Sequence, residues 1–168
     1  GGAIYVAGGG TTIIESNFEK CRALGTASTY GGGALYMAGS YNNIIGSNFN
    51  DNRVTSDKAR GGTIYISSGE GTNIQKSYFN NSYAGNGGII FMEGNKVIIS
   101  TSTFANSSSK DYGGAISIQG HNATIQDSTF ENFNSNNGGA IYVDGESTNI
   151  LRSSFDNCTA KSKGGSIN

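Results

Sequence analysis

The residues that usually hold a metal ion or a disulfide framework are scarce in this chain. It contains two cysteines and one histidine among 168 residues. Two cysteines are too few for a disulfide scaffold or for a metal site built from thiolates. We therefore expect no cofactor and no structural metal.

Charge is also scarce. Asp, Glu, Lys and Arg make up 14% of the chain, the formal net charge is −1 and the isoelectric point is about 5.8. These values exclude the basic surface that nucleic acids and anionic membranes attract, so we expect no nucleic-acid partner. No apolar run approaches the roughly 20 residues of a membrane-spanning helix, so we expect no transmembrane segment. The chain lacks an initiator methionine and a signal peptide, and we take it as a mature product or a slice of something longer.

Proline is absent, apolar residues make up only 35%, and glycine reaches 27 residues. This composition would be typical of disorder if it had no period. A period is present, because Gly-Gly pairs begin at Gly1, Gly32, Gly61, Gly87, Gly113, Gly138 and Gly164. Self-similarity at this spacing predicts a solenoid, in which each repeat buries its apolar face against its neighbours.

Each repeat reads as three short strands. The four residues after each Gly-Gly carry large aliphatic side chains in the second and fourth places, which is the period of a half-buried strand. A glycine then follows, at Gly8, Gly39, Gly69, Gly94, Gly120 and Gly145, where we expect a turn with positive φ. No run of residues shows apolar spacing typical of a helix.

Three further residues recur once in every repeat. An isoleucine lies in the second strand, a serine follows three places later, and a phenylalanine follows two places after the serine. The isoleucines are Ile13, Ile44, Ile74, Ile99, Ile125 and Ile150. The serines are Ser16, Ser47, Ser77, Ser102, Ser128 and Ser153. The phenylalanines are Phe18, Phe49, Phe79, Phe104, Phe130 and Phe155.

This pattern predicts an all-β fold: a right-handed parallel β-helix of about six coils of 25–31 residues, with three short strands per coil. It forms one solenoid over residues 1–168, with coils starting near 1, 32, 61, 87, 113 and 138 and a partial coil from 164. Equivalent residues of successive coils then lie about 4.8 Å apart. We expect internal Phe and Ile stacks, and a serine ladder whose hydroxyls bond from coil to coil.

The Gly-Gly-Ala-Ile motifs at Gly1, Gly113 and Gly138, paired with Phe-x-x-Asn at Phe49, resemble the repeats of chlamydial polymorphic outer-membrane proteins and related β-helical surface proteins. In the other copies the fourth place is Cys21, Ser82, Ser107, Phe133 or Cys158. Four copies carry Asn one place earlier, at Asn81, Asn106, Asn132 and Asn157. The resemblance covers the whole chain and implies an adhesin-like surface protein without catalysis.

Parallel β-helices also include polysaccharide lyases and hydrolases, which need acids converging in a groove. The best pair here is Glu131 and Asp156, which follow their Phe residues in adjacent coils and would be about 5 Å apart. Solvated surface charge is one interpretation of this pair, and a calcium site is the other. Asp127 and Arg152 share another coil position and are expected to pair, whereas His121 is expected to be exposed without a partner.

A second candidate is an aromatic stripe in the third place of the first strand. Strand parity predicts that these rings point outward, as an exposed surface that could bind sugars, pack on another β-helix or be covered by loops. The alternative is simple stacking of rings along the sheet. Ser117 interrupts the aromatic stripe, which comprises Tyr5, Tyr36, Tyr65, Phe91 and Tyr142.

Length varies in one place only, between each Phe and the next Gly-Gly. Gly32 follows Phe18 by 14 positions and Gly61 follows Phe49 by 12, against 8 or 9 in later coils. Insertions on one face of a solenoid are either a recognition face or neutral loops. Sequons that would permit glycans on a secreted chain occur at Asn80, Asn106, Asn122 and Asn157, in the number that chance alone predicts.

The open strand edges at both ends predict contact with flanking β-helix coils or with copies of this chain. Cys21 and Cys158 occupy equivalent places five repeats apart, so we expect free thiols, or pairing with a cysteine of a neighbouring copy or of a flanking repeat. We therefore expect a non-enzymatic structural protein at the cell surface or outside the cell, a fibre, stalk or adhesin-like segment that assembles into filaments. Surface glycans and host proteins are its other candidate partners. The alternatives are a carbohydrate-binding module that uses the aromatic stripe and, third, a polysaccharide lyase or hydrolase.

Overall fold

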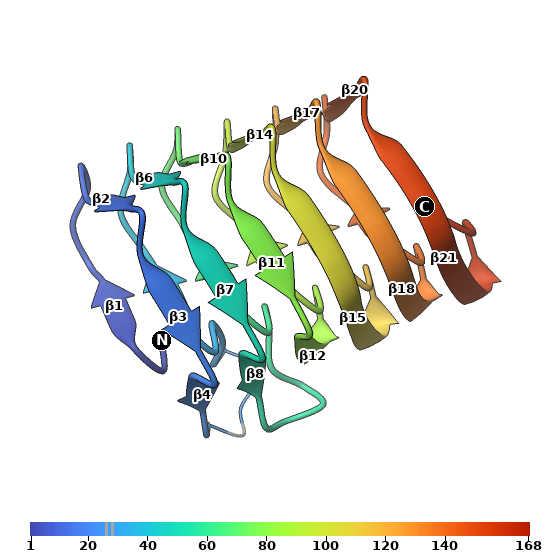
Figure 1. Ribbon diagram of the computed structural model, residues 1–168, viewed down its shortest axis with the longest axis horizontal. Coiled ribbons are helices and arrows are strands. Elements are labelled where there is room, and N and C mark those ends of the chain that lie inside the picture. Colours follow the sequence, from blue (N-terminus) through green and yellow to red (C-terminus); the bar gives the residue numbers. More distant parts are fainter. Residues whose placement is uncertain (26, 28) are drawn as a thin grey trace.

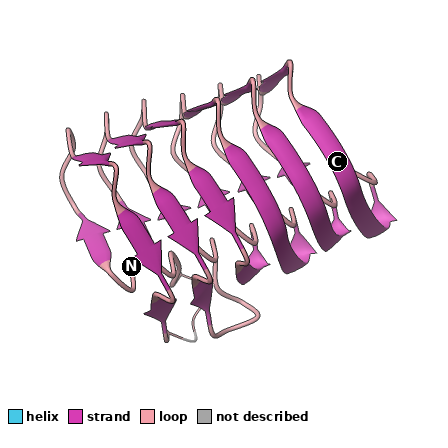
Figure 2. Ribbon diagram, viewed as in Figure 1, coloured by secondary structure: helices cyan, strands magenta, loops and turns pink. Residues whose placement is uncertain are grey.

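The structure is a computed structural model that describes residues 1–25, 27 and 29–168 (Figure 1). Three parallel sheets wind into a solenoid whose coils follow the chain from one end of the long axis to the other. Strands and turns account for the described part of the chain, with no helix in it (Figure 2). No described helix could therefore cross a membrane. The predicted parallel β-helix with three sheets is confirmed.

Two of the sheets contain six strands each. The first consists of β1 (Ile4–Val6), β5 (Leu35–Met37), β9 (Ile64–Ile66), β13 (Ile90–Met92), β16 (Ile116–Ile118) and β19 (Ile141–Val143). The second consists of β2 (Thr12–Ile14), β6 (Asn43–Ile45), β10 (Asn73–Gln75), β14 (Ile98–Ser100), β17 (Thr124–Gln126) and β20 (Asn149–Leu151).

The third sheet is less regular because it contains the corner where the coil length varies. It consists of β3 (Asn17–Glu19), β4 (Arg22–Ala23), β7 (Asn48–Asn50), β8 (Arg53–Val54), β11 (Tyr78–Asn80), β12 (Tyr83–Asn86), β15 (Thr103–Tyr112), β18 (Thr129–Asn137) and β21 (Ser154–Lys163). The loop after β8 protrudes at this corner (Figure 1), and residues 26 and 28 of the loop after β4 lie outside the described residues.

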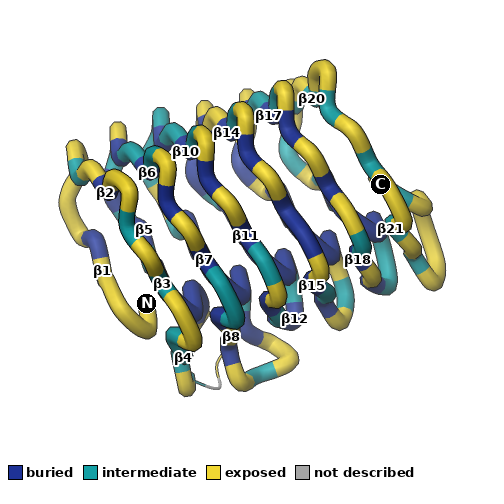
Figure 3. Tube along the Cα trace, in the orientation of Figure 1, coloured by how far each residue is buried: buried dark blue, intermediate teal, exposed yellow. Residues whose placement is uncertain are grey.

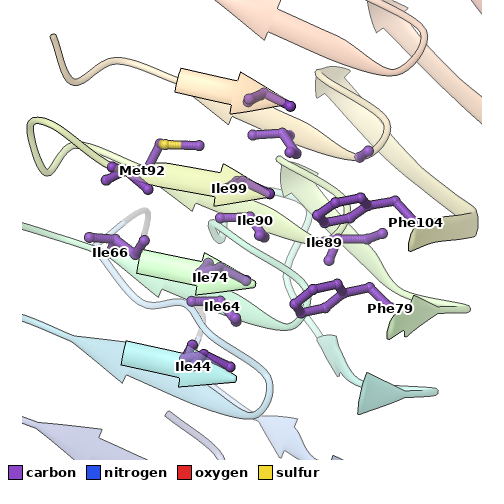
Figure 4. Close-up of a cluster of buried hydrophobic side chains, with 14 of the residues drawn as sticks. Ile44, Ile64, Ile66, Ile74, Phe79, Ile89, Ile90, Met92, Ile99 and Phe104 are labelled. Atoms are coloured by element: carbon purple, nitrogen blue, oxygen red, sulfur yellow. The ribbon is translucent and has the colours of Figure 1, made fainter. Parts of the chain in front are cut away.

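The register is the one that the sequence predicts. Ile13 pairs with Ile44 and Phe18 with Phe49, and the same alignment continues to Ile150 and Phe155. Neighbouring Phe rings lie 4.7–4.9 Å apart with interplanar angles of 2–8°. Figure 4 shows Ile44, Ile74 and Ile99 in one column, with Phe79 and Phe104 beside it. The Ile and Phe side chains of these stacks are fully buried in the middle coils. They are less buried at both ends, where Phe18, Ile150 and Phe155 are half-buried (Figure 3).

The serine ladder is buried, but its hydrogen bonds differ from the predicted hydroxyl chain. Each hydroxyl donates to a carbonyl two residues earlier, and from Ser47 to Ser153 each also accepts the backbone N–H of the serine one coil before. Ser102 Oγ, for example, donates to the Ser100 carbonyl at 2.9 Å and accepts from Ser77 N at 3.2 Å. The same pattern runs from Ser16 to Ser153. Each serine therefore satisfies a corner N–H that the sheet leaves unpaired.

The Gly-Gly pairs have two separate causes. The first glycine has φ of 61–66° from Gly32 to Gly164, a conformation that other residues adopt with strain. The second lies directly under the next coil: a Cβ on Gly88 would lie 2.1 Å from the Gly114 carbonyl oxygen. Backbone conformation therefore demands the first glycine, and close stacking of backbones demands the second.

The prediction of positive φ is wrong for most glycines that follow the first strand. Among them only Gly69 has a positive φ. A Cβ on Gly145 would instead lie 1.9 Å from the Gly120 carbonyl oxygen, and one on Gly120 2.0 Å from that of Gly94. Close approach between coils, rather than turn geometry, explains these glycines.

Candidate functional site

The aromatic stripe lies along the outer face of the first sheet, with its members aligned in register. Its exposure differs greatly from one coil to the next. Tyr5 is 64% exposed and Tyr36 is half-buried, whereas Tyr65 and Phe91 are only 3% and 2% exposed. The expectation of an exposed interaction stripe is therefore wrong for Tyr65 and Phe91, where the alternative of a cover by the variable loops agrees with the structure.

Arg60, at the end of the loop after β8, covers part of these two rings. Its guanidinium carbon lies 4.7 Å from the centroid of the Phe91 ring and 5.9 Å from that of Tyr65. Arg60 Nη1 also binds Glu93 Oε1 at 2.5 Å and the Tyr65 hydroxyl at 3.0 Å. Cation–π stacking and an ion pair together hold the loop over the aromatic stripe.

The Tyr65 hydroxyl also donates to Glu93 Oε2 at 2.6 Å. Burial, followed by the hydrogen bond to Glu93, raises the pKa of Tyr65 from 10.0 to about 12. The phenol therefore stays protonated wherever the chain is folded at ordinary pH. This cluster is a structural clamp made of a cation, an anion and two rings.

The same loop is fastened at a second place. The Tyr83 hydroxyl donates to Asp57 Oδ1 at 2.9 Å, and Lys110 Nζ lies 3.2 Å from Asp57 Oδ2. Burial, followed by the hydrogen bond to Asp57, raises the pKa of Tyr83 to about 12. The loop of 55–60 is thus fastened to two later coils.

Near β1 and β5 the outer face is open instead. A cleft of about 750 Å³ lies between the start of the first coil and the loop after β4. The residues that line it are Gly1, Gly2, Tyr5, Arg22, Ala23, Leu24, Gly25, Thr29, Tyr30, Gly31 and Tyr36. Three aromatic rings therefore converge on one concavity.

Gly31 packs closely against the Tyr65 ring. Gly31 pairs with Arg60, so the two residues occupy equivalent places in adjacent coils. A Cβ on Gly31 would lie 2.7 Å from Tyr65 Cδ1, which leaves no room for a side chain. The coil that carries Gly31 therefore has no counterpart of the Arg60 side chain.

Three contacts fix the walls of the cleft. Arg22 Nη2 lies 3.2 Å from Asp51 Oδ2, and Arg22 Nη1 also bonds the Asp51 carbonyl. The Tyr30 ring packs on Gly25, where a Cβ would lie 2.5 Å from Tyr30 Cγ. The Tyr5 and Tyr36 rings stack at 5.0 Å with an interplanar angle of 28°.

The charged residues singled out by sequence are surface groups. Glu131 and Asp156 are exposed and aligned in register, as expected. Arg152 forms the predicted pair with Asp127 through Nε at 2.7 Å and Nη2 at 3.0 Å, and this contact lowers the pKa of Asp127. Within residues 1–25, 27 and 29–168, no group of three or more His, Cys, Asp and Glu residues could hold a metal ion.

His121 is exposed, as predicted, but it has a partner. The Glu146 backbone N–H donates to His121 Nδ1 at 3.1 Å. Its own backbone N–H donates to Asn95 Oδ1 at 2.8 Å. These bonds connect three successive coils at one turn, so His121 helps to hold the coils together there.

The recurring asparagines are explained by backbone conformation. Asn81, Asn106, Asn132 and Asn157 all have φ of 48–62°, the left-handed region that Asn tolerates better than most residues. Their amides also form a chain: Asn157 donates to Asn132 at 2.7 Å and Asn132 to Asn106 at 2.9 Å. Asn106 then donates to Asn80 at 2.8 Å.

This chain includes three of the four sequon asparagines, Asn80, Asn106 and Asn157. Asn122 is the fourth, and it lies on an exposed turn with φ of 58°. The structure does not test glycosylation, so all four asparagines stay candidate sites.

Cys21 and Cys158 are free and half-buried, at equivalent corners. Cys158 Sγ lies 3.2 Å from the Asp156 carbonyl, two residues earlier, which is the bond that the serines make. Burial raises the pKa of both thiols. The fourth place of the Phe-x-x-Asn box is thus an inward-facing place that accepts Cys, Asn, Ser or Phe.

Sequence reasoning missed Arg60, Glu93 and Tyr30. None of the three occupies a position where the residue type recurs in every repeat. Arg60 and Tyr30 lie in the stretch of variable length, and Glu93 follows the first strand of its repeat. The one available signal was the longer stretch after Phe18 and Phe49, which proved to carry both Arg60 and Tyr30.

Comparison with known proteins bears on the fold alone. A model of the family described as "Right handed beta helix region" matches residues 2–168. Neither the curated proteins nor the solved structures gave a match. Since the family model spans nearly the whole chain, this chain belongs to the right-handed β-helix family.

Proposed function

We propose that this chain is a non-enzymatic structural segment of an extracellular or cell-surface protein, a β-helical fibre, stalk or adhesin-like element. The supporting observation is that the recurring residues of each repeat form coil-to-coil ladders. Phe stacks, Ser and Asn hydrogen-bond chains and close-packed glycines all have structural roles that repeat along the axis.

The ladders also favour rigidity. A rod in which each coil pairs with the next along three sheets resists bending, because any bend breaks hydrogen bonds in register. A rigid rod of this kind can act as a spacer that projects from a cell surface. The resemblance of the Gly-Gly-Ala-Ile repeats to those of chlamydial surface proteins also supports the proposed surface role.

End-to-end assembly is part of the same proposal. Parallel coils offer strand edges that another coil or another copy can extend, by the hydrogen bonding that joins coils internally. Electron microscopy of the purified chain tests this step. Continuous filaments about one coil in width support it, and discrete monomeric particles at all concentrations contradict it.

Location is tested on cells that produce the protein. Antibodies against the chain should label intact cells, and labelling restricted to permeabilised cells would contradict a surface role. An assay for products released from neutral and acidic polysaccharides tests the enzymatic alternative. Turnover that Glu131→Gln or Asp156→Asn abolishes would replace the structural proposal with a hydrolase or lyase.

A second candidate function, carbohydrate binding by the aromatic stripe, is favoured by one observation. The stripe is uncovered at Tyr5 and Tyr36, where it lines a cleft. This candidate is compatible with the structural one, since an adhesin needs both a rod and a binding site.

A further inference from the structure

We propose that Tyr112 and Tyr142 form a site of oxidative cross-linking, at which a peroxidase and hydrogen peroxide join the two rings as dityrosine. The bond ties the end of β15 to β19. It adds a covalent connection between coils that are otherwise held by hydrogen bonds and packing.

Tyr112 occupies the ladder place that Arg60 occupies two coils earlier. Arg60 pairs with Asn86, and Asn86 pairs with Tyr112, so all three directly precede a Gly-Gly pair at one corner. The Arg60 guanidinium lies nearest to Phe91, which belongs to the coil after the one that Arg60 precedes. Tyr112 reaches one coil ahead in the same way, and its ring contacts Tyr142. The corner therefore brings a second phenol onto the aromatic stripe.

The Tyr112–Tyr142 contact is the shortest ring contact between two tyrosines in the described part of the chain. The ring centroids lie 4.5 Å apart, with the ring planes tilted by 42°. The other two tyrosine pairs of the stripe have centroids 4.9 and 5.0 Å apart. Two phenol rings joined by a single bond between ring carbons have nearly the shortest of these separations. Coupling therefore requires rotation of the two rings and little movement of the backbone.

Access and bonding also distinguish this pair. Tyr112 is 39% exposed and Tyr142 is half-buried, so an oxidant reaches the pair through Tyr112 while the coils stay folded. Among the described residues neither hydroxyl has a hydrogen-bond partner. The hydroxyls of Tyr41, Tyr65 and Tyr83 are instead each bound to a carboxylate. Coupling of Tyr112 to Tyr142 thus breaks no described hydrogen bond.

The cross-link is a two-electron oxidation. Each phenol loses one electron and its hydroxyl proton, which leaves two phenoxyl radicals in contact. A carbon–carbon bond forms between the ring carbons next to the two hydroxyl positions, and the protons of these carbons move to the two oxygens. The O–O bond of hydrogen peroxide breaks, and the peroxide takes up the two electrons and two protons to give two water molecules.

Oxidation of the purified folded chain by hydrogen peroxide and a haem peroxidase tests the proposal. The reaction uses an equal mixture of isotope-labelled and unlabelled chain, and mass spectrometry of proteolytic peptides identifies the linked tyrosines. Links within one molecule carry a single isotope composition, whereas half of the links between molecules carry both. We expect Tyr112 to be linked to Tyr142 of its own molecule at least about tenfold more often than to a tyrosine of another molecule, because the ring contact acts as a high effective concentration.

Two conservative variants sharpen the test. Tyr142→Phe keeps the ring and removes the hydroxyl, so it should abolish the link and increase the share of dimers joined through Tyr112. Tyr41→Phe is the matched control, since Tyr41 is 61% exposed and makes no ring contact with a described residue. This control should leave the yield of the Tyr112–Tyr142 link unchanged.

Two results would overturn the proposal. One is absence of the Tyr112–Tyr142 link under conditions that couple free tyrosine. The other is a yield of mixed-isotope links through Tyr112 that equals or exceeds the yield within one molecule, since the ring contact would then give no advantage. Filament formation and surface labelling do not depend on this contact, so its failure would leave the structural proposal standing.

Discussion

Phe79 lies directly against Phe104, with ring centroids 4.8 Å apart and ring planes within 5° of parallel. The two residues are 25 positions apart in sequence and neighbours in space. The separation of their rings matches the spacing of hydrogen-bonded strands. Side-chain stacking and backbone pairing therefore share one repeat distance, so each coil determines the position of the next.

The first prediction concerns this stack. Phe79→Ala should lower the free energy of unfolding by about 3 to 5 kcal/mol, because it leaves a cavity between two rings in a fully buried column. Phe155→Ala is the matched control, since Phe155 is half-buried with one stacked neighbour, and its effect should be clearly smaller. Urea denaturation followed by circular dichroism measures both, and equal effects would contradict a stack that is densest in the middle.

The second prediction compares one glycine place in two coils. Gly88→Ala should destabilise the fold by at least about 3 kcal/mol or prevent folding, because its Cβ would lie 2.1 Å from the Gly114 carbonyl oxygen. Gly165→Ala occupies the equivalent place, where a Cβ would meet nothing within 4 Å, and should be nearly neutral. Thermal unfolding of the two variants checks this difference, and a neutral Gly88→Ala would refute the close backbone contact.

The third prediction concerns the serine ladder. Ser102→Ala removes the acceptor of the buried Ser77 N–H and should cost about 1 to 3 kcal/mol. Ser154→Ala, on the exposed face of the third sheet, should have little effect. Hydrogen exchange gives a second measurement, because the Ser77 amide should exchange much faster in Ser102→Ala than in the parent chain. An unchanged rate at Ser77 would disprove the bond.

These ladders also show how far sequence reasoning reached. Phe, Ile and Ser recur at fixed places, and their spacing alone predicts the three sheets, the register and the core. Hydrogen-bond partners were not predictable in the same way: a recurring serine is compatible with hydroxyl–hydroxyl or hydroxyl–backbone bonds, and only the backbone path at the corner decides between them. The glycines after the first strand were likewise misinterpreted, because turn geometry and close packing both require glycine.

The candidate site was predicted less well for a different reason. Strand parity correctly places Tyr65 on the outer face, but outer faces are exposed only where nothing folds back over them. Arg60 covers Tyr65 from a loop that belongs to no repeat place, so no periodic pattern contains it. The cleft near Tyr30 likewise lies beside a stretch of variable length.

The fourth prediction concerns pH. Tyr65 has a pKa of about 12 in the folded chain against an ordinary value of 10.0, so between pH 10 and 12 the folded chain holds a proton that the unfolded chain loses. Its contribution to stability is complete below pH 10 and is lost as pH rises through 12. Tyr65→Phe should therefore flatten the fall in stability over this window, as measured by urea midpoints at pH 9, 10 and 11. It should also remove one late phenol ionisation from the absorbance titration, and an unchanged titration above pH 11 would contradict the assignment.

Spin-label distances test the in-register stack of coils most directly. Asn17 and Ser154 are exposed members of one ladder in the third sheet, five coil-to-coil steps apart. Asn17→Cys and Ser154→Cys, labelled in a chain that also carries Cys21→Ser and Cys158→Ser, should give one narrow distance by pulsed electron resonance. Five steps of about 4.8 Å put the two α-carbons about 24 Å apart. A broad distribution, or a distance that differs from this by more than the reach of the labels, would contradict parallel coils stacked in register.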